Sequence, residues 1–281
     1  MKANAQIDLS WTSKDFSKRE MKTTLGNFQV AAFRRKVDAY LITAKNSGTH
    51  WVQFMLSHAL AEHYKKPPPS HSTGKNARDF IRAAKNPITY PDIPKIYQSH
   101  AIPSAILALN LIQAISPSPP TVVLVRDIRQ ALLSHFVKWR EKYSVTQHEY
   151  ILGSLQGKRF NADIWWYVLF FNRWGEMAKR YPERVIPVRY EDVMKAPGQA
   201  VRQIASHWEI KLDDNAVAAA EAVSGRGVVA SLQDPAYGEI IVPAQEIRDK
   251  ATLSDEDNEF INAVFARYLR HDFGYSYPTA P

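Results

Sequence analysis

Short, mostly apolar runs alternate with longer amphipathic stretches through most of the chain. Runs of strand length occupy residues 39–43, 95–98, 121–125 and 184–188. Apolar positions spaced three and four residues apart, the pattern of an amphipathic helix, occur within residues 52–60, 128–139, 201–208 and 261–269. Repeated strand-then-helix units predict an α/β fold, a central parallel sheet with helices on its faces.

Two of these runs predict where their strands lie in the sheet. Residues 121–125 are apolar throughout, as expected of a parallel strand that is covered on both faces. Pro187 interrupts the run 184–188, which favours an edge strand or a bulge, because proline cannot donate a ladder hydrogen bond. Residues 1–36 are polar and weakly patterned, so we expect an N-terminal arm followed by one α/β domain over residues 37–281.

Composition narrows the functional classes. The chain has 281 residues, with 36 Lys and Arg against 28 Asp and Glu, and its net charge of +8 favours an anionic ligand. The absence of cysteine excludes a disulfide scaffold, a thiolate nucleophile and Cys-ligated zinc. No apolar stretch approaches the roughly 18 residues that span a bilayer. The first ten residues also lack the apolar core of a signal peptide, so we expect a cytoplasmic protein with no membrane association.

A small polar loop, Ser47-Gly48-Thr49, stands between the first predicted strand and its helix. Glycine lets a backbone approach an anion closely, successive N–H groups converge on it, and Lys45 adds a positive charge. The nucleoside triphosphate loop Gly-x-x-x-x-Gly-Lys-Ser/Thr does not occur here. From these residues alone, an anion-binding loop and an ordinary single-glycine turn both remain open.

The segment 43–51, Thr-Ala-Lys-Asn-Ser-Gly-Thr-His-Trp, resembles the 5′-phosphosulfate loop of sulfotransferases, Tyr-Pro-Lys-Ser-Gly-Thr-Thr-Trp. Further resemblances follow in the order of that family, at residues 97–100, 125–134 and 190–192. The chain therefore resembles the cytosolic and bacterial sulfotransferases with a P-loop-like α/β fold. The resemblance implies 3′-phosphoadenosine 5′-phosphosulfate (PAPS) as sulfuryl donor, adenosine 3′,5′-bisphosphate (PAP) as product, and no metal.

The resemblance implies which residues bind the donor. The 5′-phosphosulfate loop would comprise Lys45, Asn46, Ser47, Gly48, Thr49 and His50. Trp51 would stack on the adenine, and Tyr190 would hydrogen-bond its edge. The 3′-phosphate would be bound by Arg126 and Ser134. The remaining candidates for the nucleotide site are Ser224 and Arg248, with Arg226 as the rival of Arg248.

The resemblance also implies the catalytic residues. His100, in Tyr-Gln-Ser-His, takes the place of the family's histidine and would act as general base on the acceptor. The family's loop lysine aligns with Asn46 and its proline with Lys45, and we expect Lys45 to provide the positive charge at the leaving group. Gln98 stands where many members carry another lysine, so that cation is missing.

The acceptor is expected to be a small molecule with a hydroxyl or amine group, and the protein a monomer or homodimer. One alternative is a P-loop-like kinase, which would depend on Mg²⁺. Another is a non-catalytic nucleotide-binding or nucleic-acid-binding module that uses the basic surplus. The dispersal of the basic residues along the chain argues against a nucleic-acid partner.

Overall fold

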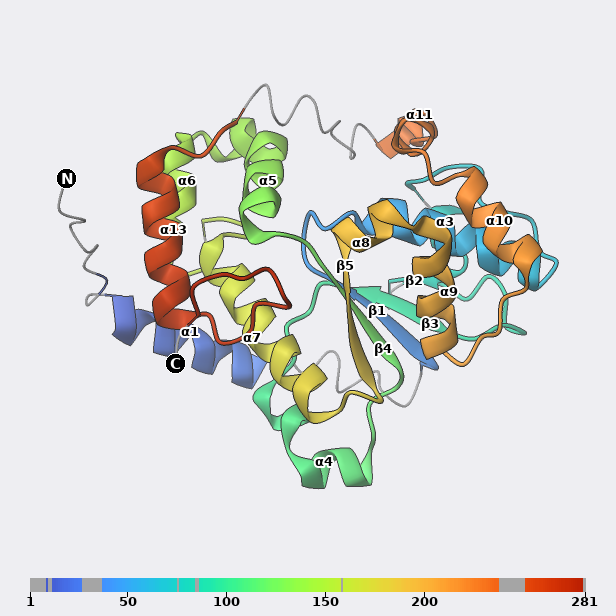
Figure 1. Ribbon diagram of the computed structural model, residues 1–281, viewed down its shortest axis with the longest axis horizontal. Coiled ribbons are helices and arrows are strands. Elements are labelled where there is room, and N and C mark those ends of the chain that lie inside the picture. Colours follow the sequence, from blue (N-terminus) through green and yellow to red (C-terminus); the bar gives the residue numbers. More distant parts are fainter. Residues whose placement is uncertain are drawn as a thin grey trace.

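The computed structural model describes residues 9, 12–26, 37–74, 76–83, 86–157, 159–237 and 251–279. A parallel five-stranded sheet crosses the molecule, with strand order β2-β3-β1-β4-β5 (Figure 1). Its strands are β1 (Ala39–Thr43), β2 (Ile81–Arg82), β3 (Ile96–Ser99), β4 (Thr121–Val125) and β5 (Val185–Arg189). The expected single α/β domain is thereby confirmed.

Two hydrophobic cores cover the two faces of the sheet, because side chains alternate between faces along each strand. In β1, Tyr40 and Ile42 belong to one core, and Ala39 and Leu41 to the other. The first core includes α1 (Ser13–Gly26), α5 (Ile128–Tyr143), α6 (Gln147–Leu152), α7 (Ile164–Arg180) and α13 (Asp255–Tyr268). The second includes α3 (Thr49–His63), α8 (Tyr190–Lys195), α9 (Pro197–His207), α10 (Asp214–Ala222) and α11 (Arg226–Ser231). Figure 1 shows these two groups of helices on opposite sides of the strands.

The remaining described elements are short and connect these layers. They are the 3-10 turns η3 (Asn76–Arg78), η4 (Ala105–Ala108) and η5 (Pro235–Tyr237), and the helix α4 (Asn110–Ile115). In the part of the chain that the structure describes, no helix is long and apolar enough to cross a membrane.

Most predicted strands agree closely with the observed ones. The runs 39–43 and 121–125 coincide with β1 and β4, whereas 95–98 and 184–188 are each displaced by one residue from β3 and β5. Pro187 lies in β5, which stands at the edge of the sheet, as its missing N–H group predicts. Strand β2 was not expected, because two residues are too few to show a strand period.

Strand β1 lies at the centre of the sheet, with two strands on each side. From β1 the chain continues to β2 and β3 on one side of the sheet, and then to β4 and β5 on the other. Connections that diverge from one strand leave a crevice at the carboxyl ends of parallel strands, where ligands bind in sheets of this type. The predicted site residues after β1, β3, β4 and β5 therefore converge on one edge of the sheet.

Helix α1, which lies within the N-terminal arm expected over residues 1–36, packs onto the domain. The ring of Phe16, 4% exposed, lies 4.4 Å from that of Tyr268 and 6.0 Å from that of Trp165. The Arg19 guanidinium binds both carboxylate oxygens of Asp163, at 2.9 and 3.2 Å. A helix that contributes so few apolar side chains to the core gives almost no periodic signal in the sequence.

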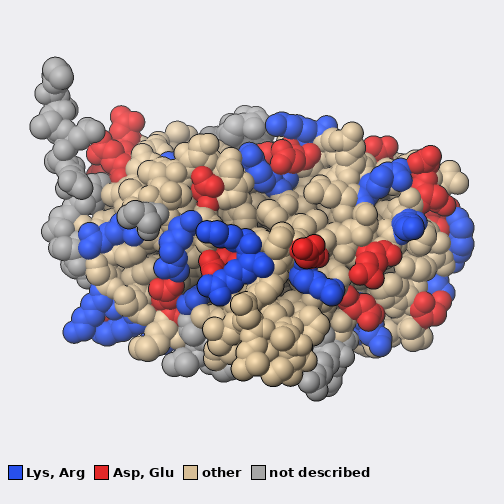
Figure 2. All heavy atoms as spheres, turned by 60° about the horizontal axis from the view of Figure 1, so that its bottom comes forward, with Lys and Arg blue, Asp and Glu red and all other residues tan. Residues whose placement is uncertain are grey.

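Charged side chains of both signs share the surface. On the face that Figure 2 brings forward, Lys and Arg are interspersed with Asp and Glu, and large uncharged areas separate them. Helix α4, at the bottom of Figure 1, contributes the exposed apolar side chains of Leu111 and Ile115. Acidic and uncharged side chains thus lie among the basic ones on this face.

The Arg19–Asp163 pair should anchor α1 to the domain. The Asp163 side chain is fully buried, so Arg19→Met leaves a buried carboxylate without its cation and should lower the free energy of unfolding by about 3 kcal/mol. Urea denaturation measures the loss. The control is Arg202→Met, which breaks an exposed pair with Asp214 and should cost less than about 1 kcal/mol. Equal losses in the two variants would contradict the anchoring role of Arg19.

Candidate functional site

The loop after β1 directs the first turn of α3 toward the carboxyl edge of the sheet. Ser47 closes the loop, because its hydroxyl donates to the Ala44 carbonyl oxygen at 2.6 Å. Gly48 has a left-handed backbone with φ of 83° and precedes the first residue of α3, Thr49. N–H groups in the first turn of a helix have no partner within the helix, so they present a site for an anion.

The absence of a side chain at Gly48 leaves room for Tyr190, which packs against Trp51 and Arg126. A Cβ at this position would lie 2.6 Å from the ring of Tyr190, so a larger residue would displace that ring. The rings of Tyr190 and Trp51 meet edge to face at 5.5 Å, and the Arg126 guanidinium lies over Tyr190 at 4.9 Å. The Trp51 indole N–H donates to the carbonyl oxygen of Ser224 at 2.7 Å. Residues from α3, α8, and the chain after β4 and α10 thus converge here.

Arg126 and Ser134 both contact Asn46. The Arg126 guanidinium donates to the Asn46 carbonyl oxygen at 3.1 Å, and the Asn46 side-chain amide donates to the Ser134 hydroxyl at 3.3 Å. Burial lowers the pKa of Arg126 from its ordinary 12.5, while the charge of Glu191 acts in the opposite direction. A guanidinium withdrawn from water in this way favours an anionic ligand.

His100 follows β3 and is held by the last residue of β1. Its Nδ1 lies 2.8 Å from the Thr43 carbonyl oxygen and 3.0 Å from the Thr43 hydroxyl. Because a carbonyl oxygen only accepts, Nδ1 carries the proton and Nε2 presents a lone pair. Thr43 also accepts hydrogen bonds from the hydroxyl of Thr49 at 2.9 Å and the amide of Gln98 at 3.1 Å. The start of α3 and the histidine are therefore attached to the same residue.

His100 is neutral at ordinary pH. Burial lowers its pKa to about 4, and the charges of Lys45 and Lys138 contribute, whereas the hydrogen bond to Thr43 acts in the opposite direction. A neutral imidazole with a free Nε2 lone pair can accept a proton from a bound substrate.

The sulfotransferase domain family matches residues 36–224 of this chain, which include the loop after β1, His100, Arg126, Ser134 and Tyr190. The chain belongs to the sulfotransferase family. The match covers most of the chain and includes all five strands of the sheet. No curated protein sequence matches the chain.

Solved structures with similar folds are also sulfotransferases or related proteins. The mouse sulfotransferase SULT7A1, complexed with PAP, is 15% identical, with 89% of this chain and 92% of that chain covered and a TM-score of 0.53. Retinol dehydratase, in complex with androsterone and PAP, is 14% identical, with coverages of 94% and 88% and a TM-score of 0.49. A sulfotransferase from Alicyclobacillus acidocaldarius is 12% identical, with coverages of 82% and 91% and a TM-score of 0.44. At 15% identity, the likeness to the mouse protein concerns the fold.

In this sulfotransferase a hydrogen-bond chain orients Asn46. The Asn161 backbone N–H donates to the Tyr143 hydroxyl at 3.0 Å, which in turn donates to Nε2 of His135 at 2.9 Å. Nδ1 of His135 then donates to the Asn46 side-chain oxygen at 2.8 Å. Burial lowers the pKa of His135 to about 3, so this imidazole is neutral and has one donor and one acceptor nitrogen. The chain leaves the amide N–H of Asn46 directed at Ser134.

The members of this hydrogen-bond chain other than Asn46 were not among the predicted site residues. His135 directly follows Ser134, and a histidine on the apolar stripe of a predicted helix was the available signal. Tyr143 and Asn161 lie in separate segments, and only the packing of α5 against the chain before α7 brings them together.

Lys45 lies in the loop after β1, and His50 lies in the first turn of α3. The Lys45 ammonium donates to the Asn161 carbonyl oxygen and lies 5.2 Å from the centre of the Trp166 ring. Burial lowers the pKa of Lys45, against the charge of Asp163. Burial, assisted by the charge of Lys138, lowers the pKa of His50 to about 4. The charge of Lys45 contributes to the lowered pKa of His100.

Arg248 lies outside the described residues, and so does the side chain of its rival Arg226. Neither can be compared with the expected 3′-phosphate contact. Among the residues that the structure describes, no group of three or more His, Asp or Glu side chains could hold a metal ion.

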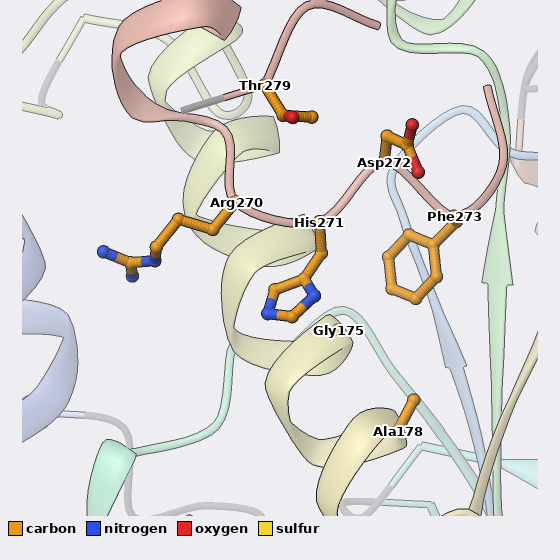
Figure 3. Close-up of a pocket in the computed structure, with 7 residues that line it drawn as sticks. All are labelled: Gly175, Ala178, Arg270, His271, Asp272, Phe273 and Thr279. Atoms are coloured by element: carbon orange, nitrogen blue, oxygen red, sulfur yellow. The ribbon is translucent and has the colours of Figure 1, made fainter. Parts of the chain in front are cut away.

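A separate hollow lies between α7 and the chain after α13 (Figure 3). Its lining comprises Gly175, Ala178, Arg270, His271, Asp272, Phe273 and Thr279. In Figure 3 the Arg270 and His271 side chains point in different directions from neighbouring backbone positions. Arg270 binds Glu20 at 2.7 Å, and His271 lies 3.5 Å from Glu176. None of the residues assigned to the nucleotide site lines this hollow.

The neutral state of His100 can be tested without a substrate. Following the imidazole resonance of His100 by NMR as the pH is lowered should give a midpoint near 4, because protonation adds a charge to a buried ring. The missing signal of a His100→Gln variant assigns the resonance. A midpoint between 6 and 7 would show that the ring is hydrated and would contradict the buried geometry.

Proposed function

We propose that this sulfotransferase transfers a sulfuryl group from PAPS to a hydroxyl or amine of a small-molecule acceptor, with His100 as general base. The observation that carries the proposal is the double attachment at Thr43, which contacts both the His100 imidazole and the Thr49 hydroxyl of the helix-initiating loop. A proton acceptor and an anion-binding helix start are thereby fixed beside each other. Such an arrangement suits transfer of an anionic group to a nucleophile that loses a proton.

The donor would bind at both of its anionic ends. The backbone N–H groups of residues 47–50 would hold the 5′-phosphosulfate, and Arg126 and Ser134 the 3′-phosphate. The adenine would be bound by Trp51 and Tyr190, with Ser224 beside them. The mouse sulfotransferase with the same fold is complexed with PAP, which supports this donor.

The chemical step requires a base and a positive charge. A lone pair on the acceptor oxygen or nitrogen forms a bond to sulfur as the bond from sulfur to the bridging oxygen breaks. The electron pair of that broken bond stays on the 5′-phosphate, which leaves as part of PAP. The acceptor proton passes to Nε2 of His100. Fixed positions and charge stabilisation provide most of the acceleration in this kind of transfer.

Lys45 is the cation we assign to the bridging oxygen. Asn46, which occupies the position of the family's lysine, is neutral, and its side chain is bonded to Ser134 and His135. The Asn46 amide therefore belongs to the 3′-phosphate side of the site. Lys45 is adjacent in the chain, and its charge already reaches His100.

Thermal unfolding with different nucleotides tests the proposal. PAP at about a hundred times its dissociation constant should stabilise the protein by about 2.7 kcal/mol and raise the melting temperature accordingly. ATP with Mg²⁺, and a single-stranded oligonucleotide, should have smaller effects at the same concentration. A larger effect of ATP with Mg²⁺ would favour a kinase, and a larger effect of the oligonucleotide a nucleic-acid-binding module.

Removing the base should affect turnover far more than nucleotide binding. His100→Ala should lower kcat by about a hundredfold or more, the usual contribution of a general base. Its dissociation constant for PAP should stay near the wild-type value, because PAP lacks the group that the acceptor attacks. The assay follows radiolabelled sulfur from PAPS into the best acceptor of a panel of phenols, alcohols and amines. Wild-type turnover by the variant would remove His100 from the mechanism.

A further inference from the structure

The neutral amides at the nucleotide site are already engaged within the protein. The Asn46 amide donates to Ser134, and the Gln98 amide donates to the Thr43 hydroxyl. The sulfuryl oxygens of a bound donor carry negative charge, and that charge needs a compensating cation close by. Lys45 is placed toward Asn161 and Trp166, at one side of the loop. A second cation at the opposite side would be needed to enclose the transferring group.

Lys138 lies on the helix face that already contributes to the site. It follows Ser134 by four positions on α5, so the two side chains share a face and their backbones are separated by about 6 Å along the helix axis. Ser134 contacts Asn46 and is the residue proposed above to bind the 3′-phosphate. Lys138 stands one turn farther along the same helix face. Its ammonium lies 5.7 Å from the centre of the Trp139 ring.

The positive charge of Lys138 influences three imidazoles of the site. Its charge lowers the pKa of His50 in the first turn of α3, of His100 after β3 and of His135 on α5. These histidines come from three elements that meet at the carboxyl edge of the sheet. Burial also lowers the pKa of Lys138 itself, which shows that its ammonium is partly withdrawn from water. A partly desolvated cation interacts more strongly with a bound anion.

We propose that Lys138 contacts the sulfuryl oxygens of the bound donor and remains on them as the bond to the phosphate breaks, which makes it a further catalytic residue. This inference rests on the proposed function, since it takes PAPS as the donor. Lys45 would then act on the bridging oxygen and Lys138 on the transferring group. The two cations would enclose the group from α5 and from the loop after β1.

Two nucleotides that differ only in the sulfuryl group provide the test. Lys138→Met should raise the dissociation constant for PAPS by about tenfold or more, the usual effect of losing a hydrogen bond to a charged group. The dissociation constant for PAP, which has no sulfuryl group, should stay at the wild-type value and also reports that the variant is folded. Calorimetry measures both constants without an acceptor. Lys138→Arg keeps the charge and should retain most of the PAPS affinity.

Matched variants separate this role from its alternatives. Lys142→Met removes the other ammonium on the Trp139 ring, one turn farther along α5, and should change neither constant. Arg126→Ala should weaken both nucleotides alike. Equal weakening of PAP and PAPS by Lys138→Met would overturn the proposal, and so would unchanged binding of both with a higher KM for the acceptor. If PAP does not bind the wild-type protein, it is the proposed function that fails.

Discussion

Thr43, the last residue of β1, is the position on which the geometry of the site depends. The register of β1 and β3 pairs Ile42 with Ser99, so the residues that follow, Thr43 and His100, meet beyond the end of the sheet. The Thr43 carbonyl fixes the proton on Nδ1 of His100, and its hydroxyl accepts from Thr49 at the start of α3. Strand register therefore determines both the tautomer of the histidine and its place beside the loop. A change in that register would separate His100 from the loop after β1.

The second constraint is the close approach of the Tyr190 ring to the backbone of Gly48. Because this residue has no side chain, Tyr190 from the other half of the chain can pack against the loop, and Trp51 and Arg126 pack against Tyr190. This contact joins the loop after β1 to the residues that follow β4 and β5. The sulfotransferase thus builds the proposed nucleotide end of its site from segments that are distant in sequence, and their packing relies on one small residue.

The sequence predicts the strands well where every residue of a strand is buried. The runs 39–43 and 121–125 match β1 and β4 because central parallel strands are apolar on both faces. Helix α1 gives no such signal, since Phe16 and a buried ion pair of Arg19 attach it, and neither produces a periodic pattern. Sequence motifs located the loop, His100 and Arg126, and the structure brings these residues to one edge of the sheet.

The finer features of the site depend on tertiary contacts that no local pattern contains. His135 orients Asn46 only because Tyr143 and the backbone of Asn161 reach its other nitrogen. Lys138 likewise appeared in the sequence as an ordinary charged position on an amphipathic helix. Its relation to the histidines of the site becomes visible only when α5 is placed against β1 and β3.

A crystal structure of the protein with PAP tests the central claim most directly. The account predicts the 5′-phosphate within hydrogen-bonding distance of the backbone N–H groups of residues 47–50, and the 3′-phosphate at Arg126 and Ser134. It also predicts that Nδ1 of His100 stays on the Thr43 carbonyl, with Nε2 facing the place from which PAP has lost its sulfuryl group. PAP bound elsewhere, for example in the hollow lined by Arg270 and His271, would contradict the account.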